Sequence, residues 1–210
     1  MGSVHGLIQT AALVIAEAST KRGKQMANPF DVVRQFERAV AEYTGAPFVV
    51  ATTSCTMAIL LACAWFYRCG ERCGITMPRY SYIGVPQSII HAGFKVDFRD
   101  EYWFGEYRLD PIPVWDSARM FTSGMYRKGQ MQCTSHHWSK ILGVSQMGCI
   151  LHDNQMADDW LRRARFDGRT EGVNAKVDRI QDIGWHAYVS PEVAAAGLVR
   201  LANLPKHNDP

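Results

Sequence analysis

A short apolar run, a small polar turn and a long apolar helix follow one another directly, and this order constrains the fold most. The run covers residues 48–51, the turn 52–56 and the helix 57–67. The same order returns more weakly in a run, a helix and a further strand, over residues 74–78, 85–91 and 94–98. Strands that alternate with helices are typical of α/β folds, because a helix carries the chain back so that the next strand runs parallel. The sequence therefore predicts an α/β fold with a mainly parallel sheet and flanking helices.

Apolar periodicity predicts the remaining elements. An amphipathic helix is expected over residues 30–43, since Asn28-Pro29 is typical of a helix start and Gly45 of a helix end. Two more strands and two more helices are expected at 112–115, 147–151, 156–166 and 191–204. The 210 residues fit one large domain. We expect a helical extension, a single domain and a short tail, over residues 1–28, 29–205 and 206–210.

Composition excludes several classes of protein. Hydrophobic residues make up 47% of the chain and charged residues 20%, which excludes a disordered or coiled-coil chain. No apolar stretch reaches the roughly 20 residues that a membrane-spanning helix needs, so no membrane segment is expected. The six cysteines lack the spacing of a disulfide scaffold, and the start of the chain lacks a secretory signal. We therefore expect a cytoplasmic protein, and the formal net charge of +3 does not by itself indicate nucleic-acid binding.

The polar turn Ser54-Cys55-Thr56 stands between a predicted strand and a predicted helix. Its hydroxyls and backbone N–H groups would lie at the positive end of the helix, an arrangement that binds phosphate. An ordinary helix N-cap uses the same residue types, so the turn alone leaves both interpretations open.

Two further side chains have the chemistry of a cofactor site. Asp116 follows an apolar run, so it would emerge at the carboxyl end of a strand, where open α/β sheets bind ligands. Lys140 is flanked by Trp138 and Leu142, whose apolar side chains would remove water from its amine and make it nucleophilic near neutral pH. A capping aspartate and a solvated lysine are the structural alternatives.

The phosphate-binding turn, the aspartate and the lysine together satisfy the needs of pyridoxal phosphate. The lysine would hold the cofactor aldehyde as a Schiff base, the aspartate would keep the pyridine nitrogen protonated, and the turn would anchor the phosphate. The sequence contains neither a P-loop nor a glycine-rich dinucleotide motif. Pyridoxal phosphate is therefore the predicted cofactor.

Zinc is the metal alternative. Cys133 precedes His136 and His137 at a tolerable ligand spacing, and Cys69 and Cys73 form a second pair. Because adjacent histidines rarely bind one ion, and because packed cysteines are common, we predict no metal site.

The order of the motifs resembles the DegT/DnrJ/StrS family of fold-type-I pyridoxal phosphate enzymes, which are best known as sugar aminotransferases. The segments that carry the resemblance span most of the chain: Phe36-Glu37 to Gly45, Ser54-Cys55-Thr56-Met57-Ala58, Pro78-Arg79-Tyr80-Ser81-Tyr82, Asp116-Ser117-Ala118, Ser135 to Lys140, and Gly184 to Pro191 followed by Ala194-Ala195. The resemblance implies that residues 29–205 are the large, pyridoxal-phosphate-binding domain of this fold.

The resemblance also implies roles for individual residues. Lys140 would be the Schiff-base lysine and Asp116 the partner of the pyridinium nitrogen, so these two are the implied catalytic residues. Tyr82 would stack on the cofactor ring. Phosphate contacts are implied for Cys55, Thr56 and Ser135, and substrate or cofactor contacts for Arg119, His137 and His186. A homodimer with the active site at its interface is implied as well.

The sequence departs from the family at several points. Arg119 stands where the family has glutamine, and His186 and Tyr188 stand where it has asparagine and arginine. Too little chain separates Phe98 from Asp116 for the strand and helix of full-length members, so a βα unit is expected to be missing. The chain also ends where the C-terminal small domain of such members begins, so that domain is expected to be largely missing.

The motifs do not encode which reaction the cofactor performs. A decarboxylase processes one amino-acid substrate, whereas an aminotransferase alternates between two, so the simpler reaction suits a reduced scaffold. The scaffold is similar to phage pyridoxal phosphate enzymes of DNA hypermodification. We therefore prefer a lyase that decarboxylates an amino-acid-modified thymidine nucleotide, free or within DNA, in the host cytoplasm, with arginines over residues 162–169 contacting phosphates. An aminotransferase for a sugar nucleotide or small molecule and a non-catalytic binding or assembly protein stay open.

Overall fold

The computed structural model describes residues 28, 30–180 and 182–210. Apart from Asn28, the predicted helical extension over residues 1–28 lies outside the described residues. The elements follow in the order α2 (Asp31–Thr44), β1 (Phe48–Thr52), α3 (Cys55–Arg68), β2 (Gly74–Pro78), α4 (Gly84–His91), β3 (Lys95–Arg99), β4 (Tyr107–Leu109), β5 (Val114–Ser117), β6 (Met131–Ser135), β7 (Gly148–His152), α5 (Gln155–Ala164) and α6 (Pro191–Leu201). Over these described residues, none of the helices is long and apolar enough to cross a membrane.

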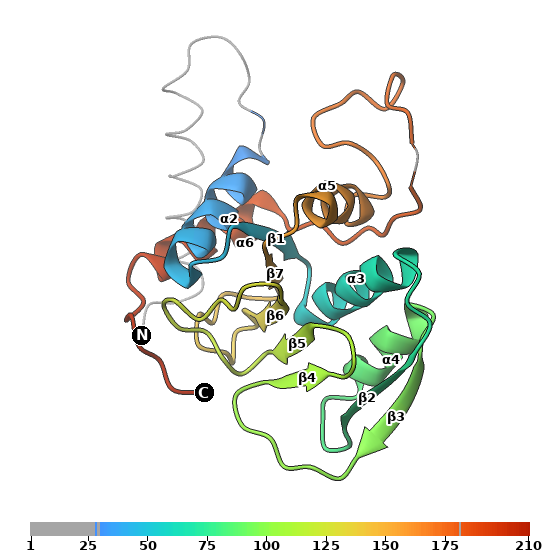
Figure 1. Ribbon diagram of the computed structural model, residues 1–210. Coiled ribbons are helices and arrows are strands. Elements are labelled where there is room, and N and C mark those ends of the chain that lie inside the picture. The colour runs from blue at the N-terminus through green and yellow to red at the C-terminus, as the bar shows by residue number, and fades with distance from the viewer. Residues whose placement is uncertain (1–27, 29, 181) are drawn as a thin grey trace.

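The strands form one nearly continuous surface (Figure 1). Five of them make a sheet in the order β1-β7-β6-β5-β4, and β2 and β3 form a separate pair. Thr76 of β2 exchanges two backbone hydrogen bonds with Asp110, which directly follows β4, at N···O distances of 2.8 and 3.1 Å. These bonds attach the β2–β3 pair to the β4 end of the five-stranded sheet.

The α/β class is confirmed, but the sheet is mixed rather than mainly parallel. β5 pairs with β6 and β2 with β3 in parallel, whereas the β1–β7, β6–β7 and β4–β5 pairs are antiparallel. The connection from β4 to β5 covers only residues 110–113. Parallel neighbours need a crossover of about a dozen or more residues, usually a helix, so this connection forces an antiparallel pair. The connection from β6 to β7 also contains no helix.

The sequence analysis does not predict β4 and β6. All five residues of β6 are buried, although Gln132, Thr134 and Ser135 are polar, so the segment shows no apolar run. β4 has only three residues and lies in the segment where a βα unit was expected to be missing. There the strand is present and the helix is absent within residues 100–113.

The predicted helices form within three residues of the expected ends. Gly45 ends α2 in the left-handed conformation at φ 79°, and its N–H donates to Ala41 O at 2.8 Å. Ser54 is the N-cap of α3, where its side chain accepts a hydrogen bond from Met57 N at 3.1 Å. Local capping therefore sets the limits of the two helices that flank β1.

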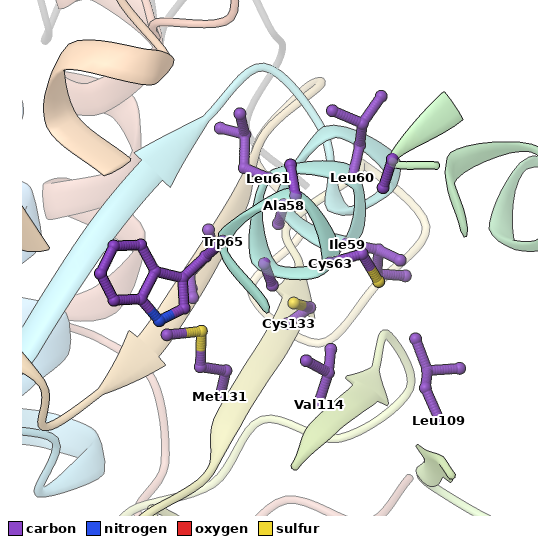
Figure 2. Packing of buried hydrophobic residues seen from close by; sticks show 14 of the residues in the cluster. Ala58, Ile59, Leu60, Leu61, Cys63, Trp65, Leu109, Val114, Met131 and Cys133 are labelled. Atoms are coloured by element: carbon purple, nitrogen blue, oxygen red, sulfur yellow. The ribbon is translucent and has the colours of Figure 1, made fainter. Parts of the chain in front are cut away.

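Helices cover both faces of the sheet (Figure 1). α2 and α6 pack together on one face, and α3 packs across the other face between α4 and α5. Successive residues of β1 enter different cores, because Val50 lies in the cluster under α3 while Val49 and Ala51 lie in the cluster under α2. Figure 2 shows part of the first cluster, in which Ile59 and Cys63 of α3 lie on the side of the helix that faces Leu109, Val114, Met131 and Cys133 of β4, β5 and β6. Burial of both faces explains the continuous apolar runs in the sequence.

The carboxyl ends of β1, β5 and β6 lie at one edge of the sheet. β5 and β6 are parallel, and β1 shares the direction of β6 because both are antiparallel to β7. The N-terminus of α3 reaches the same edge and approaches Gly148 of β7 closely, since a Cβ atom on Gly148 would lie 2.4 Å from Cys55 N. Ligands of open α/β folds bind outside the carboxyl ends of strands, so this edge is the place to look for a site.

Candidate active site

A cavity of about 390 Å³ opens at this edge of the sheet. Its size falls within the roughly 300–1,000 Å³ of ordinary ligand sites. Seven of the nine predicted site residues line it, namely Cys55, Thr56, Tyr82, Asp116, Ser135, His137 and Lys140. The fold thus brings together residues of α3, the β2–α4 connection, β5, β6 and the β6–β7 connection.

The N-terminus of α3 supplies one polar wall of the cavity. Ser54 caps the helix with its side chain, so the ordinary capping interpretation of this residue is correct. The N–H groups of Cys55 and Thr56 have no acceptor within the helix, because the first N–H groups of an α-helix have no carbonyl oxygen four residues before them in the helix. The helix dipole adds partial positive charge at the same end. Besides Ser54 and Tyr82, the hydroxyl side chains of Thr56, Ser135 and Ser139 line the same cavity. Such a wall suits an anion with several oxygen atoms.

Asp116 is the buried carboxylate of the cavity, with 5% of its surface exposed. Its Oδ2 accepts a hydrogen bond from Tyr107 Oη at 2.7 Å, and its Oδ1 accepts one from Ala118 N at 3.0 Å. Burial raises the pKa of Asp116, while these two donors and the charge of Lys140 oppose the rise. A carboxylate so far from bulk solvent interacts strongly with a cation placed beside it.

Cys55 lies beside Asp116, with Sγ 3.9 Å from Asp116 Oδ1. The thiol also donates to the carbonyl oxygen of Cys133 at 3.3 Å. Burial, together with the negative charge of Asp116, raises the pKa of the Cys55 thiol well above its ordinary value, so the sulfur stays protonated. Cys55 therefore offers an anion its backbone N–H, and its side chain is a weak donor rather than a nucleophile.

Lys140 lines the cavity from the β6–β7 connection and is half-buried. Its backbone N–H donates to His137 O at 2.8 Å, which closes a tight turn. Trp138 is 72% exposed and does not cover the lysine as the sequence suggested, whereas Leu142 is buried in the core. The charge of Lys140 lowers the pKa of Asp116, so the two side chains are close enough to interact electrostatically.

The two histidines of the zinc alternative lie in different environments. His137 lines the cavity, and its Nδ1 lies 2.9 Å from Ser139 Oγ. His136 is buried between the rings of Phe36 and Phe121, and burial lowers its pKa to about 3. Cys133 belongs to the core on the opposite face of the sheet. Within residues 28, 30–180 and 182–210, no three potential ligands converge on one point.

Two predicted site residues lie outside the cavity. Arg119 is exposed, and its guanidinium lies 5.8 Å from the ring centre of Trp103. A backbone hydrogen bond from Met120 N to Ser117 O turns the chain directly after β5, so Arg119 leaves the strand edge. His186 is exposed and pairs with Asp167 at 2.9 Å. Neither prediction of a cofactor or substrate contact within this cavity is met by the described geometry.

The arginines over residues 162–169 are not a free phosphate-binding face. Arg165 is fully buried and binds Glu37 and Glu171. Arg162 bridges Glu37 and Asp158 at 2.7 Å to each, and Arg163 binds Asp182 at 2.8 Å. The predicted phosphate contacts are therefore wrong for these three arginines, because carboxylates already hold them.

Tyr107 is the site residue that the sequence analysis misses. It lies on β4, directly opposite Asp116 on β5, and is 3% exposed. Tyr107-Arg108-Leu109 does alternate apolar and polar residues, but three residues are too few to identify a strand by alternation. Only the pairing of β4 with β5 reveals its contact with Asp116.

Several large apolar side chains on or near the cavity-lining segments are exposed. Tyr82 lines the cavity yet is 70% exposed, and the neighbouring Ile83 is 65% exposed. Tyr80 stacks on Tyr102 with an angle of 14° between the rings, and both are exposed. Trp138, between the cavity-lining residues His137 and Ser139, is exposed as well. Exposed apolar patches of this kind mark interaction surfaces.

Comparison of the whole fold with solved structures identifies its class. Sugar aminotransferase CalS13 from Micromonospora echinospora superimposes with a TM-score of 0.74 and 17% sequence identity, over 96% of this chain and 66% of that chain. PseC from Helicobacter pylori, an aminotransferase of pseudaminic acid biosynthesis, gives 0.71 and 14%, over 92% and 62%. NtdA from Bacillus subtilis, solved with bound cofactor PMP, gives 0.69 and 18%, over 96% and 55%. The fold is that of fold-type-I pyridoxal phosphate enzymes.

The sequence comparison agrees with this class. Residues 12–102 match the model of the DegT/DnrJ/EryC1/StrS aminotransferase family, so the resemblance stated from the motifs is confirmed over this part of the chain. No curated protein sequence matches the chain. The chain spans less than two thirds of the length of the solved chains compared above.

Proposed function

We propose that this chain is a pyridoxal-phosphate-dependent enzyme that acts on the amino group of its substrate, with Lys140 holding the cofactor aldehyde. The observation that carries the proposal is the convergence of Lys140, buried Asp116 and the α3 N-terminus on one cavity. The match of residues 12–102 to an aminotransferase family and the PMP in the similar NtdA structure support the same cofactor.

The residues of the cavity fit the phosphate, the ring nitrogen and the ring face of this cofactor. A phosphate would bind the N–H groups at the start of α3 and the hydroxyls of Thr56 and Ser135. A protonated ring nitrogen would bind Asp116, whose burial leaves its charge without a full solvent shell. Tyr82 would cover one face of the ring. The cavity thus offers donors for the phosphate and an acceptor for the ring nitrogen.

The protein groups have separate tasks in the proposed reaction. Bound pyridoxal phosphate supplies an electron sink for the bonds at the substrate Cα atom. Asp116 accepts the hydrogen bond of the ring nitrogen and holds its positive charge. Lys140 would hold the cofactor aldehyde through Nζ, and the same Nζ, when free, would carry a proton to or from the substrate Cα atom. His137 and Ser139, which line the cavity beside Lys140 in the sequence, offer further hydrogen-bonding groups.

Amino transfer is the reaction that the family match supports best. Its second substrate is a ketone or keto acid that restores the aldehyde form of the cofactor. A sugar nucleotide or another small molecule is the proposed amino acceptor, since the compared relatives include sugar aminotransferases.

Decarboxylation of an amino-acid-modified thymidine nucleotide is the second candidate. The specific observation in its favour is that no arginine lines the cavity among the described residues. A substrate carboxylate in the cavity of one subunit would then lack a guanidinium partner, and an unpaired, poorly solvated carboxylate is easier to lose as carbon dioxide.

A homodimer is the proposed assembly. The exposed apolar side chains of Tyr80, Tyr82, Ile83, Tyr102 and Trp138 support a second copy of the chain as the covering partner. All six cysteines are free thiols, which supports a reducing, cytoplasmic location. Sedimentation of the purified protein over a range of concentrations measures its oligomeric state. A monomer at all concentrations that bind the cofactor contradicts the proposed dimer.

Covalent trapping tests the cofactor and Lys140 together. The protein is incubated with pyridoxal phosphate, reduced with borohydride and digested for mass spectrometry. A pyridoxyl group on Lys140 is expected in the wild type and none at this position in Lys140→Ala, with Lys128→Ala as a matched control outside the cavity. A wild type that takes up no cofactor supports the non-catalytic binding or assembly protein instead.

Product analysis then separates the two reactions. Release of carbon dioxide with stoichiometric amine supports decarboxylation. Conversion of the bound cofactor to its amine form, reversed by a keto acid, supports amino transfer.

A further inference from the structure

Tyr107 connects the antiparallel strand β4 to the carboxylate of Asp116. The two residues are directly paired across β4 and β5, so their side chains lie on the same face of the sheet. Tyr107 Oη donates to Asp116 Oδ2 at 2.7 Å. The indole of Trp103 packs against the Tyr107 ring at a centroid distance of 4.8 Å, with the rings inclined by 60°. Strand register and ring packing therefore hold the hydroxyl in place.

The protein fills part of the acceptor capacity of Asp116. An ionised carboxylate has about four acceptor positions. Tyr107 Oη donates to Oδ2 at 2.7 Å and Ala118 N to Oδ1 at 3.0 Å, whereas the single S–H of Cys55, whose Sγ lies 3.9 Å from Oδ1, is directed to Cys133 O at 3.3 Å. Acceptor capacity remains for a donor that enters the cavity, and the shortest contact, from Tyr107, does most to set the carboxylate plane that faces this donor.

We propose that Tyr107 is a positioning residue for Asp116: its hydroxyl orients the carboxylate and keeps it ionised, so that Asp116 can accept the ring N–H of the cofactor. This inference rests on the proposed pyridoxal phosphate function. No proton passes between the two side chains. Burial and the adjacent Asp116 raise the pKa of Tyr107 above its ordinary value, so the hydroxyl remains a donor at every pH at which the protein works.

Four titratable groups face Asp116 from the surrounding elements. Cys55 of α3 and Cys133 of β6 are buried thiols whose pKa values burial raises well above the ordinary one, so both are neutral. Tyr107 of β4 and Lys140 of the β6–β7 connection both lower the pKa of Asp116. Loss of the Tyr107 hydroxyl therefore leaves the charge of Lys140 and the weak Cys55 contact as the side-chain contributions that favour the anion, beside the backbone N–H of Ala118.

The test compares the wild type with Tyr107→Phe, and Tyr126→Phe is the matched control. Tyr126 Oη donates to Gln130 O at 3.3 Å, outside the cavity. Pyridoxal phosphate labelled with ¹⁵N in the ring is bound to each protein across the acid and neutral range. Its affinity and its ¹⁵N chemical shift, which reports protonation of the ring nitrogen, are measured at each pH.

Tyr107→Phe removes a hydrogen bond to a charged group. It should move the acid limit of cofactor binding up by about 1–2 pH units, with a loss of affinity of about 10- to 100-fold below that limit. The ¹⁵N signal should show the ring nitrogen losing its proton at a correspondingly altered pH. Tyr126→Phe should leave both profiles at their wild-type positions.

The possible results separate the two proposals. Wild-type uptake of cofactor together with an unshifted Tyr107→Phe profile overturns the role of Tyr107 alone. A wild type that takes up no cofactor overturns the proposed function and this role with it. If Tyr107→Phe does not fold, 3-fluorotyrosine at position 107 replaces it, because this residue keeps the shape and donates more strongly. The acid limit should then move to lower pH, and an unmoved limit contradicts the proposal.

Discussion

Gly148→Ala tests how closely the start of α3 must approach the sheet. The added Cβ atom would lie 2.4 Å from Cys55 N, 2.5 Å from the carbonyl carbon of Ser54 and 2.7 Å from Cys55 Cα. All three are backbone atoms, so a rotated side chain cannot relieve the overlap. Because ordinary carbon contacts begin at about 3.5 Å, the first turn of α3 must move away from β7 by about 1 Å.

Two opposing effects set the change in the free energy of unfolding caused by Gly148→Ala. Alanine restricts the unfolded chain more than glycine does and would stabilise the fold by about 0.4–1 kcal/mol where it fits. Overpacking of a dense core costs about 1–3 kcal/mol. We expect a net loss of about 1–2 kcal/mol in the free energy of unfolding, which lowers the Tm of a chain of this size by about 2–8 °C. A 1 Å shift also breaks N–H contacts to an anion, so phosphate affinity should fall at least about 10-fold.

Urea unfolding and titration with pyridoxal phosphate measure the two effects separately. Gly74→Ala is the matched control, because its Cβ atom would meet only the flexible carboxylate of Asp97, at 3.1 Å, far from the cavity. This control should stay within about 0.5 kcal/mol of the wild type and bind the cofactor normally. A Gly148→Ala protein as stable as the wild type, with unchanged affinity, would refute the requirement for close approach.

The remaining predictions concern buried charges. Glu37→Gln should lower the free energy of unfolding by about 3–5 kcal/mol in urea, because it removes the carboxylate that buried Arg165 shares with Arg162 and leaves Arg165 with Glu171 alone. A loss below about 1 kcal/mol contradicts this prediction. Burial lowers the pKa of His136 in the folded protein to about 3, below its unfolded value. The neutral ring therefore contributes its full stability above about pH 6.5, and this stability is lost as pH falls. His136→Phe should reduce the loss in the free energy of unfolding between pH 7 and pH 5 by about 2 kcal/mol, and a loss equal to that of the wild type contradicts the prediction. Asp116 has a raised folded pKa, so its ionisation opposes folding as pH rises past the ordinary value. Asp116→Asn should therefore leave the cofactor-free protein at least as stable at pH 7 while abolishing turnover, and a clear loss of stability would show that the hydrogen bonds of the carboxylate dominate.

The fold was predictable where local signals and burial agree. The runs and caps that enclose α2, β1 and α3 are contiguous in sequence, and each element forms within three residues of its expected position. β6 was not predictable in this way, because Gln132 and Thr134 are buried by partners that lie far along the chain. Gln132 pairs with Leu151 of β7, and its Nε2 donates to Glu106 Oε2 at 3.4 Å, contacts that no apolar pattern predicts.

The site was predictable to the extent that its chemistry requires particular residue types at the ends of elements. The polar turn before α3, Asp116 after an apolar run and Lys140 after Ser135 could each be found from position and chemistry, and one cavity contains all of them. Arg119 was misplaced because one backbone turn after β5 decides which way the next side chain leaves the strand. A turn of this kind leaves no mark in the residue types.

The class of fold and the chemical groups available to a cofactor follow from the order of residues, because helix caps, apolar runs and a strand-end carboxylate act over a few neighbouring residues. Which of those groups share a cavity, and which strand lies beside Asp116, follow from the packing of distant segments. A connection of four residues turns β4 antiparallel and sets the hydroxyl of Tyr107 against the carboxylate. That contact depends on strand register and packing, which are properties of distant segments brought together, and no local pattern of residues contains them.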